Sequence, residues 1–363
     1  MAGSAKKILN NQNGVALLLV LGVMAVLIAV SLEANRRIRA SVVTTATGRD
    51  RHALVQMATS GVHAAMALLS ADPQVPPVDC HLDTWADGEI QTELLNALPF
   101  DTGRVGMEII DERSRIQVNA LVKSPGGNEL NPEQMFLWQR FLEPMGDLLE
   151  GTEIESPAAI TDAIKDWLDG GDDDAVTGLY GAETLYYQDL EPPYACRNGK
   201  IDHIGELLMI RGITPALFYG TSELPGIKNF LTVHGMVAKD GDRLSFDGKV
   251  NINTAPLTVL TALLPEIHQD LAPSIFEYRT TLEKEKGDEA MATLASPTWY
   301  RNAPGCADLT IPATLITVTS NLFRIRTTAI IDPVQLTVTA VVERVTEKTS
   351  GKNTCRVLSW EIS

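Results

Sequence analysis

The stretch GVALLLVLGVMAVLIAVSLE, residues 14–33, decides the fold of this 363-residue chain. Residues 15–32 carry no charge, and a helix over that range is roughly 27 Å long, close to the hydrocarbon thickness of a bilayer. A buried core helix or the core of a signal peptide needs a shorter apolar run. The stretch therefore predicts a transmembrane helix.

The segment before the apolar run has the properties of a leader peptide. MAGSAKKILNNQNG, residues 1–14, is polar, carries Lys6 and Lys7, and ends in Gly14. A secretory signal peptide has its small-residue cleavage site after the apolar run, and here the order is reversed. The leader resembles that of a type IV prepilin. This resemblance implies that prepilin peptidase cuts between Gly14 and Val15 and leaves the apolar helix on the mature chain.

Leu19 narrows the resemblance to one family. It is the fifth residue after the expected cut, where most pilins and pseudopilins carry a Glu that bonds the terminal amine of a neighbouring subunit. A carboxylate in the bilayer costs about 2.5 to 3.5 kcal/mol unless it is paired, and Leu19 cannot make that bond. Leucine here, with Val15 in place of the usual Phe, is similar to the minor pseudopilin K family of type II secretion systems. That family is held to sit at the filament tip.

Apolar residues continue the helix beyond the membrane. They recur at spacings of three and four, which marks one helix face: Leu54, Ala58, Val62, Ala65 and Leu69. We therefore expect an amphipathic continuation over 35–72 that packs on a soluble domain and ends at Asp72–Pro73. The alternative is a linker and a separate helix, because Gly48 and Gly61 each cost up to about 1 kcal/mol inside a helix.

Alternating apolar residues predict a sheet interrupted by a long helical region. Residues 104–122 read as a hairpin that turns at 112–114, and further strands are expected at 315–318, 322–331, 335–345 and 354–361. The fold class is therefore α+β: a pilin-like long N-terminal helix packed on an antiparallel sheet, with a large all-α domain inserted between strands. The expected units are a leader at 1–14, a transmembrane helix at 15–34, its amphipathic continuation at 35–72, the first part of the pseudopilin domain at 73–129, the inserted helical domain at 130–312 and the C-terminal strands at 313–363.

This order of elements also resembles pseudopilin K. Four further stretches carry the resemblance across most of the mature chain: DAIKDWLD at 162–169, GAETLYYQDLEPPY at 181–194, IDHIGELLMIRGITPALF at 201–218 and VNINTAPLTVLTALLP at 250–265.

The basic residues on the two sides of the apolar run and the type of leader predict opposite orientations in the membrane. Lys6 and Lys7 precede the run, and Arg36, Arg37 and Arg39 follow it. The positive-inside rule would put the C-terminal side in the cytoplasm, but large domains cross largely regardless of such charges. The leader type implies export, so we expect a single-pass protein of the bacterial inner membrane with its C-terminal domain in the periplasm.

Composition limits the function further. A formal net charge of −16 opposes non-specific binding to nucleic acid or to anionic lipid, because such binding needs Lys and Arg. The cysteines lie far apart and form no zinc motif: Cys80, Cys196, Cys306 and Cys355. One or two disulfides are compatible with a periplasmic domain, and the pairing stays open among three arrangements.

The densest acidic segment is DWLDGGDDDAVTG, residues 166–178. Its carboxylates repel one another unless a hard cation lies among them, and Ca²⁺ accepts six to eight oxygen ligands. The candidate ligands are Asp166, Asp169, Asp172, Asp173 and Asp174, with Glu183 and Asp202 at longer range. The segment departs from the EF-hand pattern at Val176, and a solvated acidic loop is the alternative. The resemblance to pseudopilin K favours calcium.

Residues 250–279 resemble a helix-hairpin-helix element, in which Asn253 or Thr254 would cap a helix starting at Pro256. Such elements bring glycine amides to DNA phosphates, but Glu266 and His268 occupy the glycine places here. DNA binding is therefore disfavoured. No H-E-x-x-H, G-x-S-x-G or P-loop motif is present, which favours a protein that is not an enzyme. A membrane-tethered enzyme with an unrecognised site remains a rival.

The pattern as a whole predicts a minor pseudopilin that caps the tip of the periplasmic pseudopilus and supports export of folded proteins across the outer membrane. The alternative is a minor pilin of a type IV pilus or DNA-uptake system. The resemblance implies as partners the minor pseudopilins I and J, the major pseudopilin, prepilin peptidase and the inner membrane. We expect no nucleic acid and no small-molecule substrate.

Overall fold

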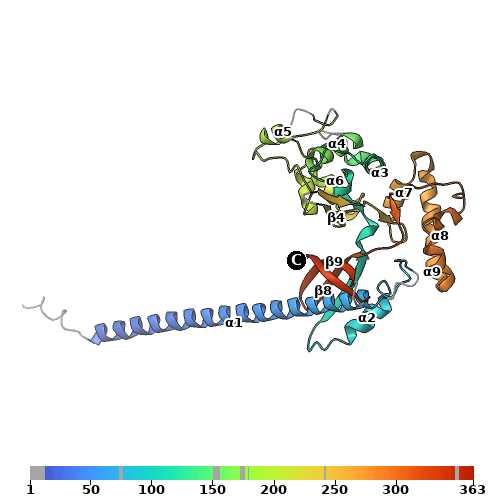
Figure 1. The fold of residues 1–363 in the computed structure, drawn as a ribbon. Helices are drawn as coiled ribbons and strands as arrows, with labels where there is room; N and C mark the ends of the chain where they lie inside the picture. The colour runs from blue at the N-terminus through green and yellow to red at the C-terminus, as the bar shows by residue number, and fades with distance from the viewer. Residues whose placement is uncertain are drawn as a thin grey trace, which may run out of the picture.

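The computed structural model describes residues 13–72, 77–149, 156–171, 176–178, 180–240, 243–347 and 351–363. A long helix carries a four-stranded sheet on its C-terminal part, and the sheet lies between this helix and a larger inserted region (Figure 1). The leader residues 1–12 lie outside the described residues.

Helix α1 (Asn13–Ala71) runs without a break from the apolar segment into the soluble domain. The predicted face of Leu54, Ala58, Val62, Ala65 and Leu69 is fully buried, which confirms one continuous helix and excludes a linker within it. The first part of α1 extends far beyond the body (Figure 1), and residues 14–49 are exposed. Among the described helices, α1 alone is long and apolar enough to cross a membrane.

Gly61 explains how closely α1 approaches the sheet. A Cβ at this position would lie only 3.0 Å from Thr327 Cγ2 and 3.1 Å from Val105 Cγ1. Beside it, Thr327 Oγ1 donates a 2.8 Å hydrogen bond to the carbonyl oxygen of Ala58. The helical cost of Gly61 is therefore offset by packing, because a larger residue would push α1 away from the strands.

The sheet has the strand order β1-β8-β9-β10 and is antiparallel throughout. Its strands are β1 (Arg104–Asp111), β8 (Leu322–Ile331), β9 (Val334–Thr346) and β10 (Asn353–Ile362). Strand β1 precedes the insertion and the other strands follow it, so the predicted split sheet is confirmed. Ile109 lies opposite Ile325 in this register, and both are buried against α1 together with Trp85 and Phe323.

The predicted hairpin over 104–122 is wrong. Strand β1 pairs with β8, and the chain then turns through a short 3-10 helix at Glu112–Ser114. The next strand, β2 (Ile116–Gln117), pairs in parallel with β3 (Leu231–Thr232) inside the inserted region. Apolar and polar residues alternate in both parts of 104–122 because each part has a buried face. Such alternation indicates which face of a strand is buried, but it does not indicate which strand is its partner.

The inserted region is mainly helical, but it is not all-α as predicted. Its α-helices are α3 (Pro132–Leu142), α4 (Pro157–Leu168), α5 (Thr184–Gln188), α6 (Pro215–Tyr219), α7 (Leu257–Leu263), α8 (Ala272–Glu285) and α9 (Asp288–Leu294). Strands β4 (Met236–Asp240) and β5 (Arg243–Phe246) form a hairpin, and β6 (Val250–Asn251) pairs in parallel with β7 (Ile316–Thr317). Short parallel pairs therefore lie where the chain enters and leaves the insertion, and α2 (Gly88–Asn96) packs beside β1.

Two hydrophobic cores divide the body. One lies between α1 and the sheet, and the other fills the inserted region around Trp138, Phe141 and Trp167. The second core already contains Ile116 and extends to Ile316. It therefore reaches beyond the boundaries at 130 and 312 that helical patterning suggests, because short strands with little helical character contribute to it.

The expected caps of α7 are also wrong. Pro256 holds the N-cap position, and no side chain caps the helix. Asn253 instead donates through Nδ2 to the carbonyl oxygens of Asp79 and Leu294, and Thr254 Oγ1 donates to Asp111 Oδ2 at 2.6 Å. These buried hydrogen bonds join the inserted region to the body formed by α1 and the sheet, and they satisfy polar groups that are shielded from water.

Candidate functional site

Three of the predicted calcium ligands meet in one buried cluster. Asp166 lies in the last turn of α4, Asp169 follows directly after that helix, and Glu183 precedes α5. Their carboxylate oxygens all lie within 4.8 Å of one another, and all three residues are buried. Burying several like charges together is costly unless a cation compensates them.

Lys165 supplies positive charge to this cluster. Its Nζ lies 2.6 Å from Asp169 Oδ2 and 3.7 Å from Asp166 Oδ1. It also donates to Thr177 Oγ1 at 2.7 Å, and the Thr177 N–H donates to Asp166 Oδ2 at 3.1 Å. Lys165 therefore compensates part of the negative charge of Asp166 and Asp169. The spacing of four between Lys165 and Asp169 on a helix was a signal for this ion pair that the analysis of the sequence missed.

Glycines make room for the carboxylates. A Cβ on Gly181 would overlap Asp166 Oδ2, and a Cβ on Gly178 would overlap Asp162 Oδ2. Burial, and then the negative charge of Asp166, raise the pKa of Asp162 above its ordinary value. The backbone between α4 and α5 therefore wraps closely around acidic side chains, and substitutions at either glycine would displace them.

The donor set fits a hard cation. All three carboxylates offer oxygen, which Ca²⁺ prefers, whereas soft metals select thiolates. The nearby Cys196 Sγ contacts the carbonyl oxygen of Asp166 at 3.4 Å, and burial raises the pKa of its thiol to about 12. Cys196 is therefore a neutral thiol at physiological pH, and the site does not resemble a zinc centre.

The other predicted calcium ligands are not part of the described cluster. Asp202 is half exposed and is held away from the cluster by ion pairs with Arg197 and Lys200, and hydrogen bonding to Lys200 lowers its pKa. Its own lysine and arginine partners explain why it does not join Asp166. Three further candidates lie outside the described residues: Asp172, Asp173 and Asp174. Calcium binding itself stays a prediction.

The processing residues lie at the exposed start of α1. Gly14, Val15 and Leu19 are helical and make no contact with the body. The disulfide expectation is not met, because all cysteines are free thiols. Cys80 Sγ contacts Met291 Sδ at 3.5 Å, and burial raises the pKa of Cys80 to about 12.

The helix-hairpin-helix resemblance ends at the turn between α7 and α8. The turn is a 3-10 helix, Glu266–Leu271, with Ile267 81% exposed at its surface. Arg211, in the separate segment 201–218, lies with its guanidinium carbon 4.5 Å from the ring centre of Tyr186. An apolar, acidic turn and a packed arginine do not form a phosphate-binding surface.

Buried ion pairs join α1, the sheet and the insertion, and the sequence did not reveal them. Arg344 on β9 donates to Asp72 Oδ2 at 2.6 Å and also to Asp79 Oδ1. Burial raises the pKa of Asp79 to about 6 even though Arg344 opposes the shift, and burial raises the pKa of Asp83 to about 7. The oxygens of the three aspartates lie within 4.8 Å of one another, so Arg344 holds together an acidic junction.

Glu112 anchors the turn into the insertion. Its carboxylate is fully buried and accepts hydrogen bonds from Arg324 Nε at 2.8 Å and Nη2 at 2.6 Å. Burial alone would raise the pKa of Glu112, but the charge and hydrogen bonds of Arg324 outweigh burial and lower it to about 2. The pair fixes the point where the chain leaves the sheet.

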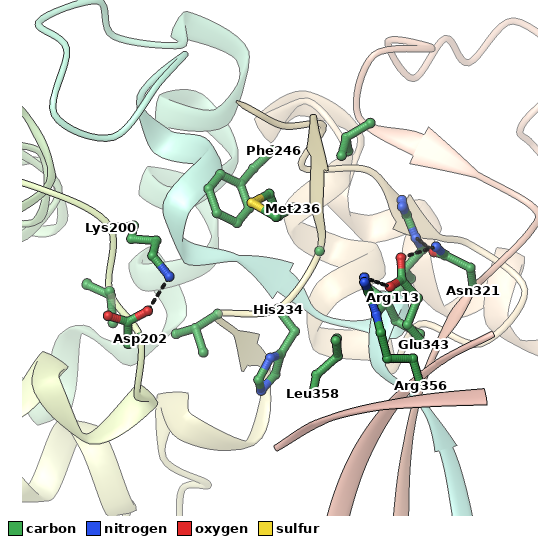
Figure 2. A pocket seen from close by; sticks show the side chains of 15 residues that line it. Arg113, Lys200, Asp202, His234, Met236, Phe246, Asn321, Glu343, Arg356 and Leu358 are labelled. Carbon is green, nitrogen blue, oxygen red and sulfur yellow. Dashed lines mark hydrogen bonds and ion pairs between the residues drawn. The ribbon is translucent and has the colours of Figure 1, made fainter. Parts of the chain in front are cut away.

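A cleft of about 340 Å³ separates the β4–β5 hairpin from the edge of the sheet. Figure 2 shows Met236 and Phe246 on the hairpin side and Leu358 and Arg356 on the β10 side. Charged groups line it in pairs, such as Arg356 with Glu343 and Lys200 with Asp202. Several of its charged groups are therefore paired with one another.

These features define a class. A long apolar N-terminal helix packed on an antiparallel sheet, with a large region inserted after the first strand, is a pseudopilin-like α+β fold. The family "Type II secretion system (T2SS), protein K" matches residues 114–220. Over these residues the chain is similar to the type II secretion system protein K family.

The relatives carry that name in several bacteria. Type II secretion system protein K of Aeromonas hydrophila is 27% identical over 210 residues, covering 57% of this chain and 61% of the relative. The Klebsiella pneumoniae protein is 28% identical over 214 residues, covering 58% and 60%. The Pseudomonas aeruginosa protein is 26% identical over 274 residues, covering 74% and 72%. The alignments with the first two relatives thus span about three fifths of their length.

A solved structure has a similar fold. The match is a chain in the crystal structure of the GspK-GspI-GspJ complex from the enterotoxigenic Escherichia coli type 2 secretion system. The TM-score is 0.61 at 17% identity, and the match covers 88% of this chain and 99% of that chain. At this identity the likeness concerns the fold.

Proposed function

We propose that this chain is a minor pseudopilin that caps the tip of the type II pseudopilus together with minor pseudopilins I and J. In this role it supports export of folded proteins across the outer membrane. The observation that carries the proposal is the large inserted region held beyond the sheet at the far end of α1 (Figure 1). The solved relative is a complex with GspI and GspJ, which supports these partners.

The proposed mechanism is assembly. The exposed apolar part of α1 spans the inner membrane, with the body in the periplasm, and then enters a bundle of neighbouring helices. Leu19 offers no carboxylate to the terminal amine of another subunit, so the chain needs no subunit ahead of it. The insertion widens the body beyond the sheet and blocks addition above. The major pseudopilin would lie below.

Immunogold labelling of pseudopili tests the position. We expect label from an epitope on the inserted region at one end of each filament. Label distributed along the filament would contradict the tip role. Purification of the chain with tagged pseudopilins I and J, and not with the major pseudopilin alone, gives a second readout.

Processing is tested by N-terminal sequencing of the membrane form with and without prepilin peptidase. A mature chain beginning at Val15 only when the peptidase is present is the expected result. A different start would contradict the leader assignment.

We further propose that Asp166, Asp169 and Glu183 hold a calcium ion. The ion would supply positive charge to the buried carboxylates and link the end of α4 to the start of α5. This proposal rests on their burial, their mutual approach within 4.8 Å and the all-oxygen donor set.

The calcium proposal is tested by thermal unfolding in calcium and in EGTA. A ligand present at about 100 times its Kd stabilises by about 2.7 kcal/mol, so calcium should raise the Tm of the wild type by several degrees. Asp166→Asn should abolish the shift, and Asp202→Asn, which lies outside the cluster, should keep it. Equal Tm values for the wild type in calcium and EGTA would exclude the site.

A further inference from the structure

A bare section of α1 lies between the apolar run and the body. The apolar run ends at Leu32, and the first fully buried side chain is Leu54. Figure 1 shows most of this section of α1 extending away from the sheet and the insertion. Only its C-terminal residues approach the sheet, where Thr47, Asp50 and Arg51 line a pocket with residues of β9 and β10. Apart from His52, its basic residues are all arginines: Arg36, Arg37, Arg39, Arg49 and Arg51.

The first three arginines form a collar directly beyond the apolar run. At a rise of about 1.5 Å per residue, Arg36 to Arg39 lie roughly 6 to 11 Å beyond Leu32 along the axis, at the depth of the polar headgroup layer of a bilayer that the run spans. Successive residues turn by about 100°, so Arg36, Arg37 and Arg39 project on different sides of the helix. We call these three residues the arginine collar.

The positive charge of the arginine collar is available to an external partner. Arg37 Nε lies 2.9 Å from Glu33 Oε1 in an exposed pair, and such pairs contribute little and exchange readily. Within the described part of the chain, Arg36 and Arg39 form no ion pair. The whole chain has a net charge of −16, so its body is repelled by an anionic surface and the collar is a local reversal of sign.

We propose that the arginine collar binds the phosphate headgroups of anionic phospholipids where α1 leaves the membrane on the side of the body. A guanidinium group offers paired N–H donors that match phosphate oxygens. The contacts fix the depth of the helix, and they must break when the helix is extracted into a filament. The proposal rests on membrane insertion of α1 in the proposed function and is independent of the tip role.

The test measures lipid selectivity around the full chain in phosphatidylcholine bilayers. Spin-labelled phosphatidylglycerol and spin-labelled phosphatidylcholine are added separately, and electron spin resonance gives the association of each lipid with the protein. One basic residue near the surface favours an anionic lipid by about fivefold. We therefore expect at least about a fivefold preference for phosphatidylglycerol at about 0.1 M salt, where the Debye length is about 10 Å, falling towards unity at about 1 M salt.

Variants separate the collar from general basicity. The triple variant R36Q/R37Q/R39Q should lose the preference, and R36K/R37K/R39K should retain most of it. The matched control is R49Q/R51Q, whose residues lie roughly 26 to 29 Å beyond Leu32, more than a Debye length from the headgroups. This control should keep the wild-type preference.

Two outcomes overturn the proposal: equal association of both lipids with the wild type, or an equal loss of preference in R49Q/R51Q and in the triple variant. Resistance to carbonate extraction is measured for every variant. A wild type that carbonate extracts would instead refute the membrane span of α1 within the proposed function. A tip role disproved by labelling leaves the lipid result unaffected.

Discussion

Replacing Arg344 by Gln should remove the central link of the acidic junction. Arg344 is 4% exposed and donates to Asp72 at the end of α1, to Asp79, and to the carbonyl oxygen of Ser320 at 2.7 Å. Its guanidinium also lies 4.9 Å from the ring centre of Phe323. Glutamine cannot reach these partners together or supply positive charge.

The expected loss of stability follows from the carboxylates left behind. Removing one member of a buried ion pair typically costs about 3 to 5 kcal/mol, because the partner remains desolvated and uncompensated. The pKa of Asp79 is already raised to about 6 by burial against the opposing charge of Arg344, and the substitution raises it further. The folded state then binds more protons than the unfolded state from about pH 4 upward, so its stability falls as pH rises. The loss should be larger at pH 8 than at pH 5.

Guanidinium unfolding of the purified full chain in detergent, followed by tryptophan fluorescence, measures this loss. Trp85 packs 5.2 Å from Phe323 in the same core and reports on it. The control is Arg326→Gln on β8, whose pair with Glu108 is exposed on both sides and should contribute less than about 1 kcal/mol. Adding Asp72→Asn and Asp79→Asn to R344Q should recover part of the loss. A loss no greater than that of R326Q, or one that is equal at both pH values, would refute the reasoning.

Three further predictions concern single positions. Asp83→Asn keeps an acceptor for the Cys80 N–H. Burial raises the pKa of Asp83 to about 7, so the charged carboxylate destabilises the fold as pH rises from about 4 to 7. We expect the variant to gain about 1 to 4 kcal/mol in free energy of unfolding at pH 8 and nothing at pH 4, measured by the same unfolding assay. Gly61→Leu should lower the free energy of unfolding by at least about 2 kcal/mol because it forces α1 from the sheet, whereas Gly48→Ala, which has open space around it, should change it by less than about 1 kcal/mol; similar values for the two would contradict this packing. Gly181→Ala should weaken calcium binding at least tenfold in isothermal titration, because its Cβ overlaps a carboxylate oxygen; unchanged affinity would place the ion elsewhere.

Local patterns predicted the elements of this protein well. The apolar run, the buried face of α1 and the long C-terminal strands each follow from a periodicity that repeats over many residues. The approach of Asp169 to Asp166 was predictable, because both lie at the end of one helix.

The candidate site was predictable only in its local part. Glu183 joins the cluster and Asp202 does not, although both are acidic and both follow the same loop. The difference lies in the neighbours of Asp202: Lys200 and Arg197 compete for its carboxylate. This competition between basic side chains for one carboxylate depends on their positions in the folded chain, which cannot be predicted from composition.

The sequence by itself determined the long N-terminal helix, the long strands and the apolar face of each, because these properties depend on residues a few positions apart. Only the tertiary structure decided that Arg104–Asp111 pairs with Leu322–Ile331 instead of with its own neighbour. It also decided that Arg344 meets Asp72 and Asp79. An alternating strand satisfies its hydrogen bonds equally well with any suitable edge, so the choice of partner is made by the burial of both cores at once. The apolar surface buried in the two cores together is a property of the whole folded chain, and no single stretch of the sequence determines it.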